Sequence, residues 1–144
     1  MSAEQNKVLV HRLYEEVFNQ KNLAAIDDYF APGVIDHSLP PGAPAGIEGV
    51  KLTIGMFQGA FPDLHITVED SIAEGDMVVA RWTLRGTHEG ASLGMPPTGK
   101  QVTMPGVSLL RFDGGKAVES RVVFDQLGML QQLGLAPMPA QAAS

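Results

Sequence analysis

The chain has 144 residues, of which 44% are hydrophobic and 18% charged, and its formal net charge is -6. This length and balance predict one globular domain and exclude a disordered or coiled-coil chain. The acidic charge and the lack of Lys/Arg runs argue against a nucleic-acid surface, and the absence of cysteine excludes disulfides, thiolate metal sites and a cysteine nucleophile.

Helices are predicted first along the chain. In residues 4–20, apolar side chains recur at the i, i+3, i+4 spacing of a helix with one buried stripe. A second, short helix follows Asn22 and ends at Pro32-Gly33. Residues 34–37 resemble a strand, the Pro/Gly-rich residues 40–46 predict a surface loop at the mouth of a pocket, and residues 47–61 predict a third helix.

Strands follow. The period changes to two from Leu64 to a turn at residues 74–76, and long strands are predicted at residues 77–88, 101–112 and 117–124. Residues 113–116 form a glycine-containing hairpin turn, and residues 126–134 a short helix. We expect one domain over residues 1–135 and a flexible tail over residues 136–144. Helices followed by consecutive strands predict an α+β fold with helices on one face of a mostly antiparallel sheet.

Several motifs in this order resemble those of one family. They are Asp36-His37, Phe61-Pro62-Asp63-Leu64, Glu74-Gly75-Asp76, Ala80-Arg81-Trp82, Gly86-Thr87-His88-Glu89-Gly90, Pro96-Pro97-Thr98-Gly99, Asp125-Gln126-Leu127-Gly128 and Gln132-Leu133-Gly134. As a set they resemble the SnoaL-like polyketide cyclases, or ester cyclases, of the NTF2-like superfamily. The resemblance extends from the first helix to Gly134.

The resemblance implies a cone-shaped barrel in which the N-terminal helices pack on the concave face of a curved sheet. It also implies an intramolecular aldol condensation inside the cone without metal or cofactor, and self-association, as a homodimer or homotetramer, through the outer sheet face. The family's acid/base aspartate maps by its motif onto Asp125. Since the superfamily also contains hydroxylases, isomerases, epoxide hydrolases and binding modules, the fold alone does not determine the reaction.

Asp125 has two interpretations. A carboxyl group can serve as base and then as acid if an apolar cavity raises its pKa, but Asp before a short helix is also a preferred N-cap. The period of two puts Arg121 on the same face of the strand as Asp125, where its cation would keep the carboxylate ionised. The alternative for Arg121 is a surface side chain paired with Glu119 or another carboxylate.

Two histidines are further candidates. His88 shares the parity of Trp82 along its strand and is predicted to act with Asp125 in catalysis, and His37 borders the Pro-rich loop and is predicted to bind substrate. For each, a hydrogen-bonded structural histidine is the alternative. The histidines lack the spacing of common zinc motifs, so no metal site is predicted.

Tyr14, Phe57, Trp82 and Met104 are predicted, with Arg121 and His37, to bind a small apolar or aromatic molecule. Aromatic residues at helical spacing are also typical of an ordinary core.

The leading hypothesis is cyclase chemistry on an enolisable polycyclic or ester substrate. The alternatives are a non-catalytic binding protein, or an isomerase or hydrolase on the same fold; for a steroid-type isomerase Tyr14 is available, but the second acid is not obvious. No apolar run is long enough for a membrane span and no export signal is visible, so we expect a cytoplasmic protein with no membrane partner.

Overall fold

The first helix begins at a capping box formed by Ser2 and Gln5. The Ser2 hydroxyl accepts a hydrogen bond from the Gln5 backbone N–H (3.1 Å), and the Gln5 side chain accepts one from the Ser2 backbone N–H (2.8 Å). The helix α1, Ala3–Leu13, then continues directly into the π-helical segment η1, Tyr14–Asn19. The helix predicted over residues 4–20 is therefore confirmed, but its last turn and a half is wider than the periodicity suggests.

The computed structural model describes residues 1–137, and most of the tail predicted from residue 136 onwards lies outside the described residues. The remaining helices are η2 (Leu23–Ala25), α2 (Ile26–Tyr29), α3 (Ile47–Ala60) and α4 (Gln126–Gln132). The strands are β1 (Phe30–Asp36), β2 (His65–Glu74), β3 (Met77–Thr87), β4 (Gln101–Asp113) and β5 (Lys116–Phe124).

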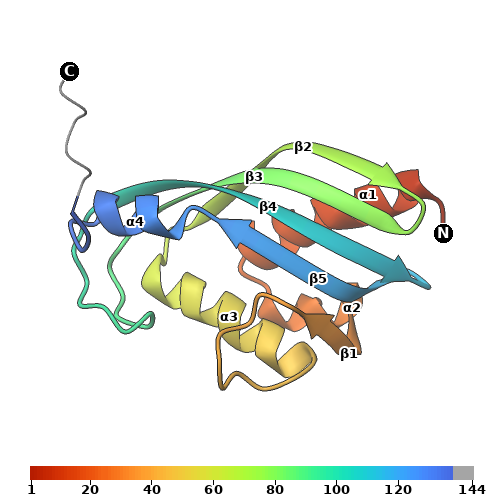
Figure 1. The fold of residues 1–144 in the computed structure, drawn as a ribbon, viewed down its shortest axis with the longest axis horizontal. Helices are drawn as coiled ribbons and strands as arrows, with labels where there is room; N and C mark the ends of the chain where they lie inside the picture. The colour runs from red at the N-terminus through yellow and green to blue at the C-terminus, as the bar shows by residue number, and fades with distance from the viewer. Residues whose placement is uncertain (138–144) are drawn as a thin grey trace.

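The strands form one sheet in the order β1-β5-β4-β3-β2. The hairpins β2–β3, β3–β4 and β4–β5 are antiparallel, whereas β1 pairs with β5 in parallel. Figure 1 shows the sheet curving over the helices, with α1 and α3 on the same side. The α+β cone with N-terminal helices on the concave face is therefore confirmed.

The first strand differs from the prediction. The sequence suggested that the second helix ends at Pro32-Gly33 and that a strand starts at residue 34, but β1 already starts at Phe30. Its pairing with β5 is interrupted between Phe30 and Ile35. Proline and glycine are tolerated in this strand because it lies at the sheet edge, where an interruption leaves the rest of the ladder intact.

The end of β4 that extends beyond β5 is covered by α4. The Gln132 side-chain amide pairs with the backbone of Thr103, accepting from its N–H (2.8 Å) and donating to its carbonyl (2.9 Å), so it replaces a neighbouring strand there. Met129 and Leu133 of this segment are buried. In residues 1–137, no helix has the length and apolar character needed to cross a membrane.

Candidate functional site

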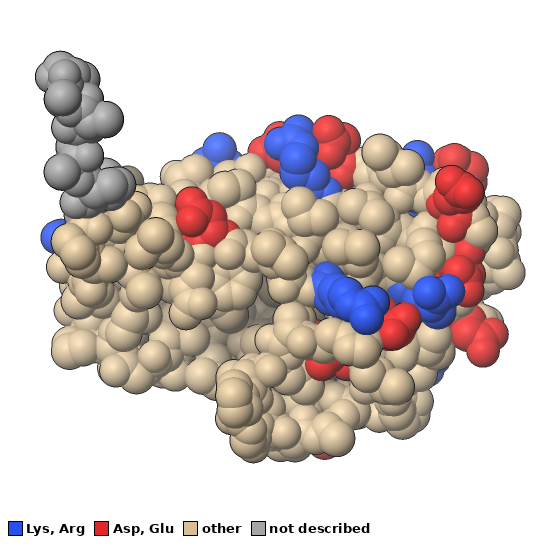
Figure 2. Space-filling model, viewed as in Figure 1, with Lys and Arg blue, Asp and Glu red and all other residues tan. Residues whose placement is uncertain are grey.

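A cavity of about 110 Å³ lies between the concave face of the sheet, the first helix and α3. Its wall is mainly aliphatic and aromatic, and Phe57 of α3 and Phe124 of β5 contact each other edge to face at a ring-centroid distance of 5.5 Å. Figure 2 shows a hollow between β5 and α3 whose surroundings are mostly uncharged. The polar side chains in the wall are Tyr14, Asp36, Ser38, Thr53, Trp82, Ser108 and Ser120.

Three of these polar side chains form one buried cluster. The Trp82 indole N–H donates to the Ser108 hydroxyl (2.9 Å), and the Tyr14 hydroxyl is hydrogen-bonded to the same oxygen. Tyr14 and Ser108 bring two hydroxyl hydrogens to the cluster, and their mutual bond uses one of them. The other O–H is therefore available to donate to an oxygen of a bound molecule.

The fold brings this cluster together from three elements. Tyr14 is the first residue of η1, whereas Trp82 and Ser108 lie on the neighbouring strands β3 and β4. Gly106 of β4 lies opposite Trp82 in the ladder, and a Cβ atom there would approach the indole to 2.2 Å, so glycine leaves room for the ring. Burial raises the pKa of Tyr14 to about 12, and the charge of Asp36 adds to this effect. Tyr14 is thus a neutral hydrogen-bond donor.

Asp36, the last residue of β1, supplies the one carboxyl group among the described residues of the wall. Its Oδ1 accepts hydrogen bonds from the backbone N–H (2.9 Å) and the hydroxyl of Ser38. Ser38 in turn accepts from the backbone N–H of Val122 (3.1 Å), which ties the carboxyl group to β5. Within residues 1–137, Oδ2 of Asp36 has no hydrogen-bond donor, so this oxygen is free to act on a ligand.

For Asp125 and Arg121 the structure agrees with the second interpretation that the sequence left open, a helix cap and a surface side chain near Glu119. The residues of β5 that line the cavity are Ser120, Val122 and Phe124, so the opposite parity points away from it. Asp125 is exposed and caps α4, with Oδ1 accepting from the Gly128 backbone N–H (2.9 Å). Arg121 is exposed and lies 4.0 Å from Glu119, and it forms no ion pair with Asp125 in the described part of the chain.

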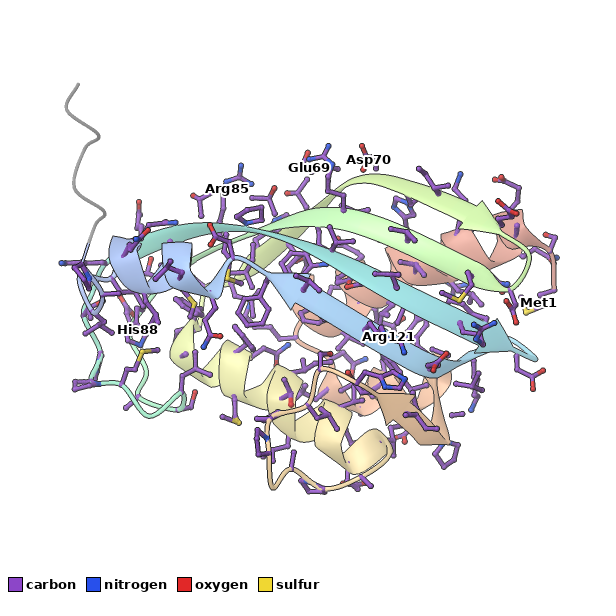
Figure 3. All side chains as sticks on the ribbon, in the orientation of Figure 1. Met1, Glu69, Asp70, Arg85, His88 and Arg121 are labelled. Carbon is purple, nitrogen blue, oxygen red and sulfur yellow. The ribbon has the colours of Figure 1, made fainter. Side chains whose placement is uncertain are left out.

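The two histidines also lie outside the cavity wall. His88 is fully buried at the end of the molecule that carries α4 (Figure 3), where its Nδ1 accepts from the Thr98 backbone N–H (3.3 Å) and bonds the Thr98 hydroxyl (3.1 Å). Its Nε2 has no partner among residues 1–137. His37 is exposed, and its Nε2 lies 2.7 Å from Glu119. Both histidines make structural contacts outside the cavity wall, but His37 contacts the Glu119 side chain rather than loop backbone, and only one ring nitrogen of His88 is hydrogen-bonded.

Tyr14, Phe57, Trp82 and Met104 all line the cavity, as the sequence suggested, and their role in binding stays a prediction. Sequence reasoning missed Asp36 and Ser108 as site residues. Their signals were present: Ser108 has the parity of Met104 along its strand, and Asp36 belongs to a motif of which only the histidine was selected.

The comparisons with known proteins agree with this fold. The family model of the SnoaL-like polyketide cyclases matches residues 8–133. A nogalonic acid methyl ester cyclase of Streptomyces nogalater is 32% identical over 108 residues, which cover 74% of this chain and 78% of the relative. Among solved structures, TsrD of Streptomyces laurentii matches with a TM-score of 0.85 and 25% identity, over 94% of this chain and 99% of TsrD.

AclR of Streptomyces galilaeus, named as a candidate hydroxylase, also matches, with a TM-score of 0.85 and 31% identity over 99% of this chain and 93% of AclR. Relatives that are named for different reactions thus share this fold. Membership of the family therefore does not determine which reaction a member catalyses. The match of the family model to most of the chain shows that this protein belongs to the SnoaL-like polyketide cyclase family.

Proposed function

We propose that this protein is a cyclase-type enzyme that acts on a carbon acid inside the cavity, with Asp36 as its acid/base residue. The observation that carries the proposal is that Asp36, whose Oδ2 accepts no hydrogen bond within residues 1–137, and the Tyr14–Ser108 pair line the same mainly apolar cavity.

This pair of groups suits enolate chemistry. A carboxylate removes a proton next to a carbonyl, and the negative charge moves to the carbonyl oxygen, where a fixed donor stabilises it. A carboxylate base combined with a tyrosine donor is an established arrangement for such reactions. The raised pKa of Tyr14 keeps it a donor rather than a competing anion.

The cyclisation balances with one carboxyl group. Asp36 takes the proton from the acidic carbon, the enolate carbon forms a new bond to a ketone carbon of the same molecule, and the resulting alkoxide takes a proton back from Asp36. No atom is gained or lost.

We propose an ester-bearing substrate, because several relatives carry the name methyl ester cyclase. The cavity volume lies below the about 300–1,000 Å³ of typical ligand pockets and near the about 150 Å³ that holds a benzene ring. We therefore expect one ring to be enclosed and the rest of the substrate to extend through the mouth.

The test compares Asp36→Asn with Asp125→Asn. Turnover of nogalonic acid methyl ester and exchange of its acidic hydrogen in D2O are measured for the wild type and both variants. Asp36→Asn is expected to lower both rates roughly 10²- to 10⁴-fold, the usual contribution of an acid/base group. Asp125→Asn, the matched control, is expected to keep them. The opposite result, with Asp125→Asn inactive and Asp36→Asn active, would contradict the assignment.

The exposure of Asp125 favours one second candidate, a binding protein without catalysis. The same experiment separates the two. Binding of the ester by the wild type without hydrogen exchange or turnover would support the binding protein and exclude the enzyme.

A further inference from the structure

We propose that Ser120 binds the second oxygen of the substrate and thereby selects 1,3-dicarbonyl compounds, such as β-keto esters, over simple ketones. This inference rests on the function proposed above and adds the substrate class. It starts from the position of Ser120 in the sheet.

Ser120 is the direct neighbour of Asp36. The two residues are register partners on the parallel strands β1 and β5, which lie about 4.8 Å apart in a sheet. Both side chains line the cavity, so the Ser120 hydroxyl flanks the carboxyl group on the same face. The pairing is fixed locally, because the His37 backbone N–H donates to the Ser120 carbonyl (2.9 Å).

Ser120 also lies near the Tyr14–Ser108 pair. In the β4–β5 ladder Ser120 faces Leu110 and Ser108 faces Val122, which makes the two serines diagonal neighbours at about 7–8 Å. The concave face therefore carries a row of polar side chains in the order Asp36, Ser120, Ser108. Leu110 and Val122, their partners in the ladder, leave the surroundings of this row apolar.

The two serines differ in what they already bind. The Ser108 hydroxyl is engaged by Trp82 and Tyr14. The residue Ser120 is 2% exposed, and its hydroxyl takes part in none of the side-chain hydrogen bonds within residues 1–137. Unlike Thr53 Oγ1, which also belongs to the wall, the Ser120 oxygen is not one of the fully enclosed atoms without a partner, so it is open to the cavity. A hydroxyl that faces the cavity and has no partner in the protein can donate to an oxygen of a bound molecule.

The chemistry of a 1,3-dicarbonyl compound matches this row. Its acidic carbon lies between two carbonyl groups, and after deprotonation the negative charge is shared by both oxygens. With the acidic carbon at Asp36, one oxygen accepts from the Tyr14–Ser108 pair and the other from Ser120. A ketone with one oxygen would leave Ser120 unpaired, and sites built to bind a polar group discriminate strongly against analogues that lack it.

The test uses two single-ring probes and the chain of 144 residues. Methyl salicylate is an aromatic mimic of an enolised β-keto ester and carries both oxygens, whereas 2-ethylphenol keeps the phenol and lacks the ester. Dissociation constants are measured by NMR chemical-shift titration. The wild type is expected to bind methyl salicylate more tightly than 2-ethylphenol, and Ser120→Ala to weaken methyl salicylate roughly tenfold while 2-ethylphenol is unchanged.

Two further variants serve as controls. Ser108→Ala is expected to weaken both probes by the same factor, because it removes part of the donor shared by both. Ser120→Thr keeps the hydroxyl and is expected to keep the preference for methyl salicylate, even if its added methyl group weakens both probes. A melting temperature of Ser120→Ala equal to or above that of the wild type confirms that the change acts on binding rather than on folding.

The outcomes separate the two proposals. If Ser120→Ala retains the wild-type preference, the role of Ser120 is overturned and the function of Asp36 is untouched. If the wild type binds neither probe, or binds both equally well, the substrate class is overturned. Loss of turnover in Asp36→Asn is measured independently of the probes, so failure of the proposed function is recognised by itself.

Discussion

Both tyrosines of the chain are held in their neutral form by the fold. Burial raises the pKa of Tyr14 to about 12, and burial together with the hydrogen bond that Tyr29 donates to Glu16 (2.5 Å) raises the pKa of Tyr29 to about 12. In the unfolded chain a tyrosine has a pKa near about 10. The folded values are higher, so the contribution of these residues to stability is complete below about pH 10 and is lost as the pH rises through about 12.

We therefore expect an ultraviolet titration of the folded protein to show no tyrosinate until the pH approaches 12, where unfolding accompanies ionisation. The protein in concentrated urea, as the control, should titrate near about pH 10. Reversible ionisation of one tyrosine near pH 10 in the folded protein would show that the hydroxyl of Tyr14 or Tyr29 is in contact with water.

The alternation of residues along a strand predicts which side chains share a face. It predicts site residues only when the face that lines the cavity is also known. The alternation in β5 separates Ser120, Val122 and Phe124 from Arg121 and Asp125, but alternation does not say which set faces the helices. Val123 is as apolar as Val122, so hydropathy leaves the choice open. The motif position of Asp125 favoured the face that lies away from the cavity, and the packing of α3 and the first helix places Asp36, not Asp125, in the cavity wall.

Among the secondary-structure elements, α4 gives Asp125 a structural role, because Asp125 is the N-cap residue of this helix. Asp125→Ala removes the acceptor for the Gly128 backbone N–H and is expected to lower the free energy of unfolding by about 1 kcal/mol. Asp125→Asn should leave it nearly unchanged, because asparagine caps as well as aspartate. Urea unfolding measures both. Both variants are expected to keep turnover. A loss of turnover without a loss of stability would show that Asp125 takes part in catalysis.

The long strands β3 and β4 were predictable because their alternation extends over many residues and one face is buried. Segments that depend on tertiary packing were not. The π-helical segment η1 has ordinary helical periodicity in sequence, and β1 contains Pro32 and Gly33, which locally favour a helix end or a turn. Both segments carry residues of the cavity wall, Tyr14 and Asp36. Tyr14 was selected from the sequence as a binding residue, whereas Asp36 was not selected.

On the scale of the whole molecule, the convex face of the sheet carries apolar side chains that no helix of residues 1–137 covers. Val123 of β5 is 67% exposed and is paired with Val107 of β4, while Ile35 of the adjacent strand β1 is 60% exposed. We propose that this face forms the contact between two copies of the chain, as the family resemblance led us to expect. In a contact with two-fold symmetry, a residue near the axis meets its own copy.

Val123→Lys is expected to convert a wild-type dimer into a monomer in sedimentation experiments. Two lysines brought together across the axis would be desolvated without a partner, and an uncompensated buried charge costs roughly 3 kcal/mol or more, equivalent to more than about a hundredfold in the dissociation constant. The matched control is Val8→Lys, because Val8 is 56% exposed on α1, on the other side of the sheet, and its change should leave the dimer intact. The cavity lies on the concave face, so the monomeric variant should still bind methyl salicylate. Dissociation by Val8→Lys and not by Val123→Lys would assign the contact to the helical side instead, and a monomeric wild type would show that the exposed strip is not a self-association surface.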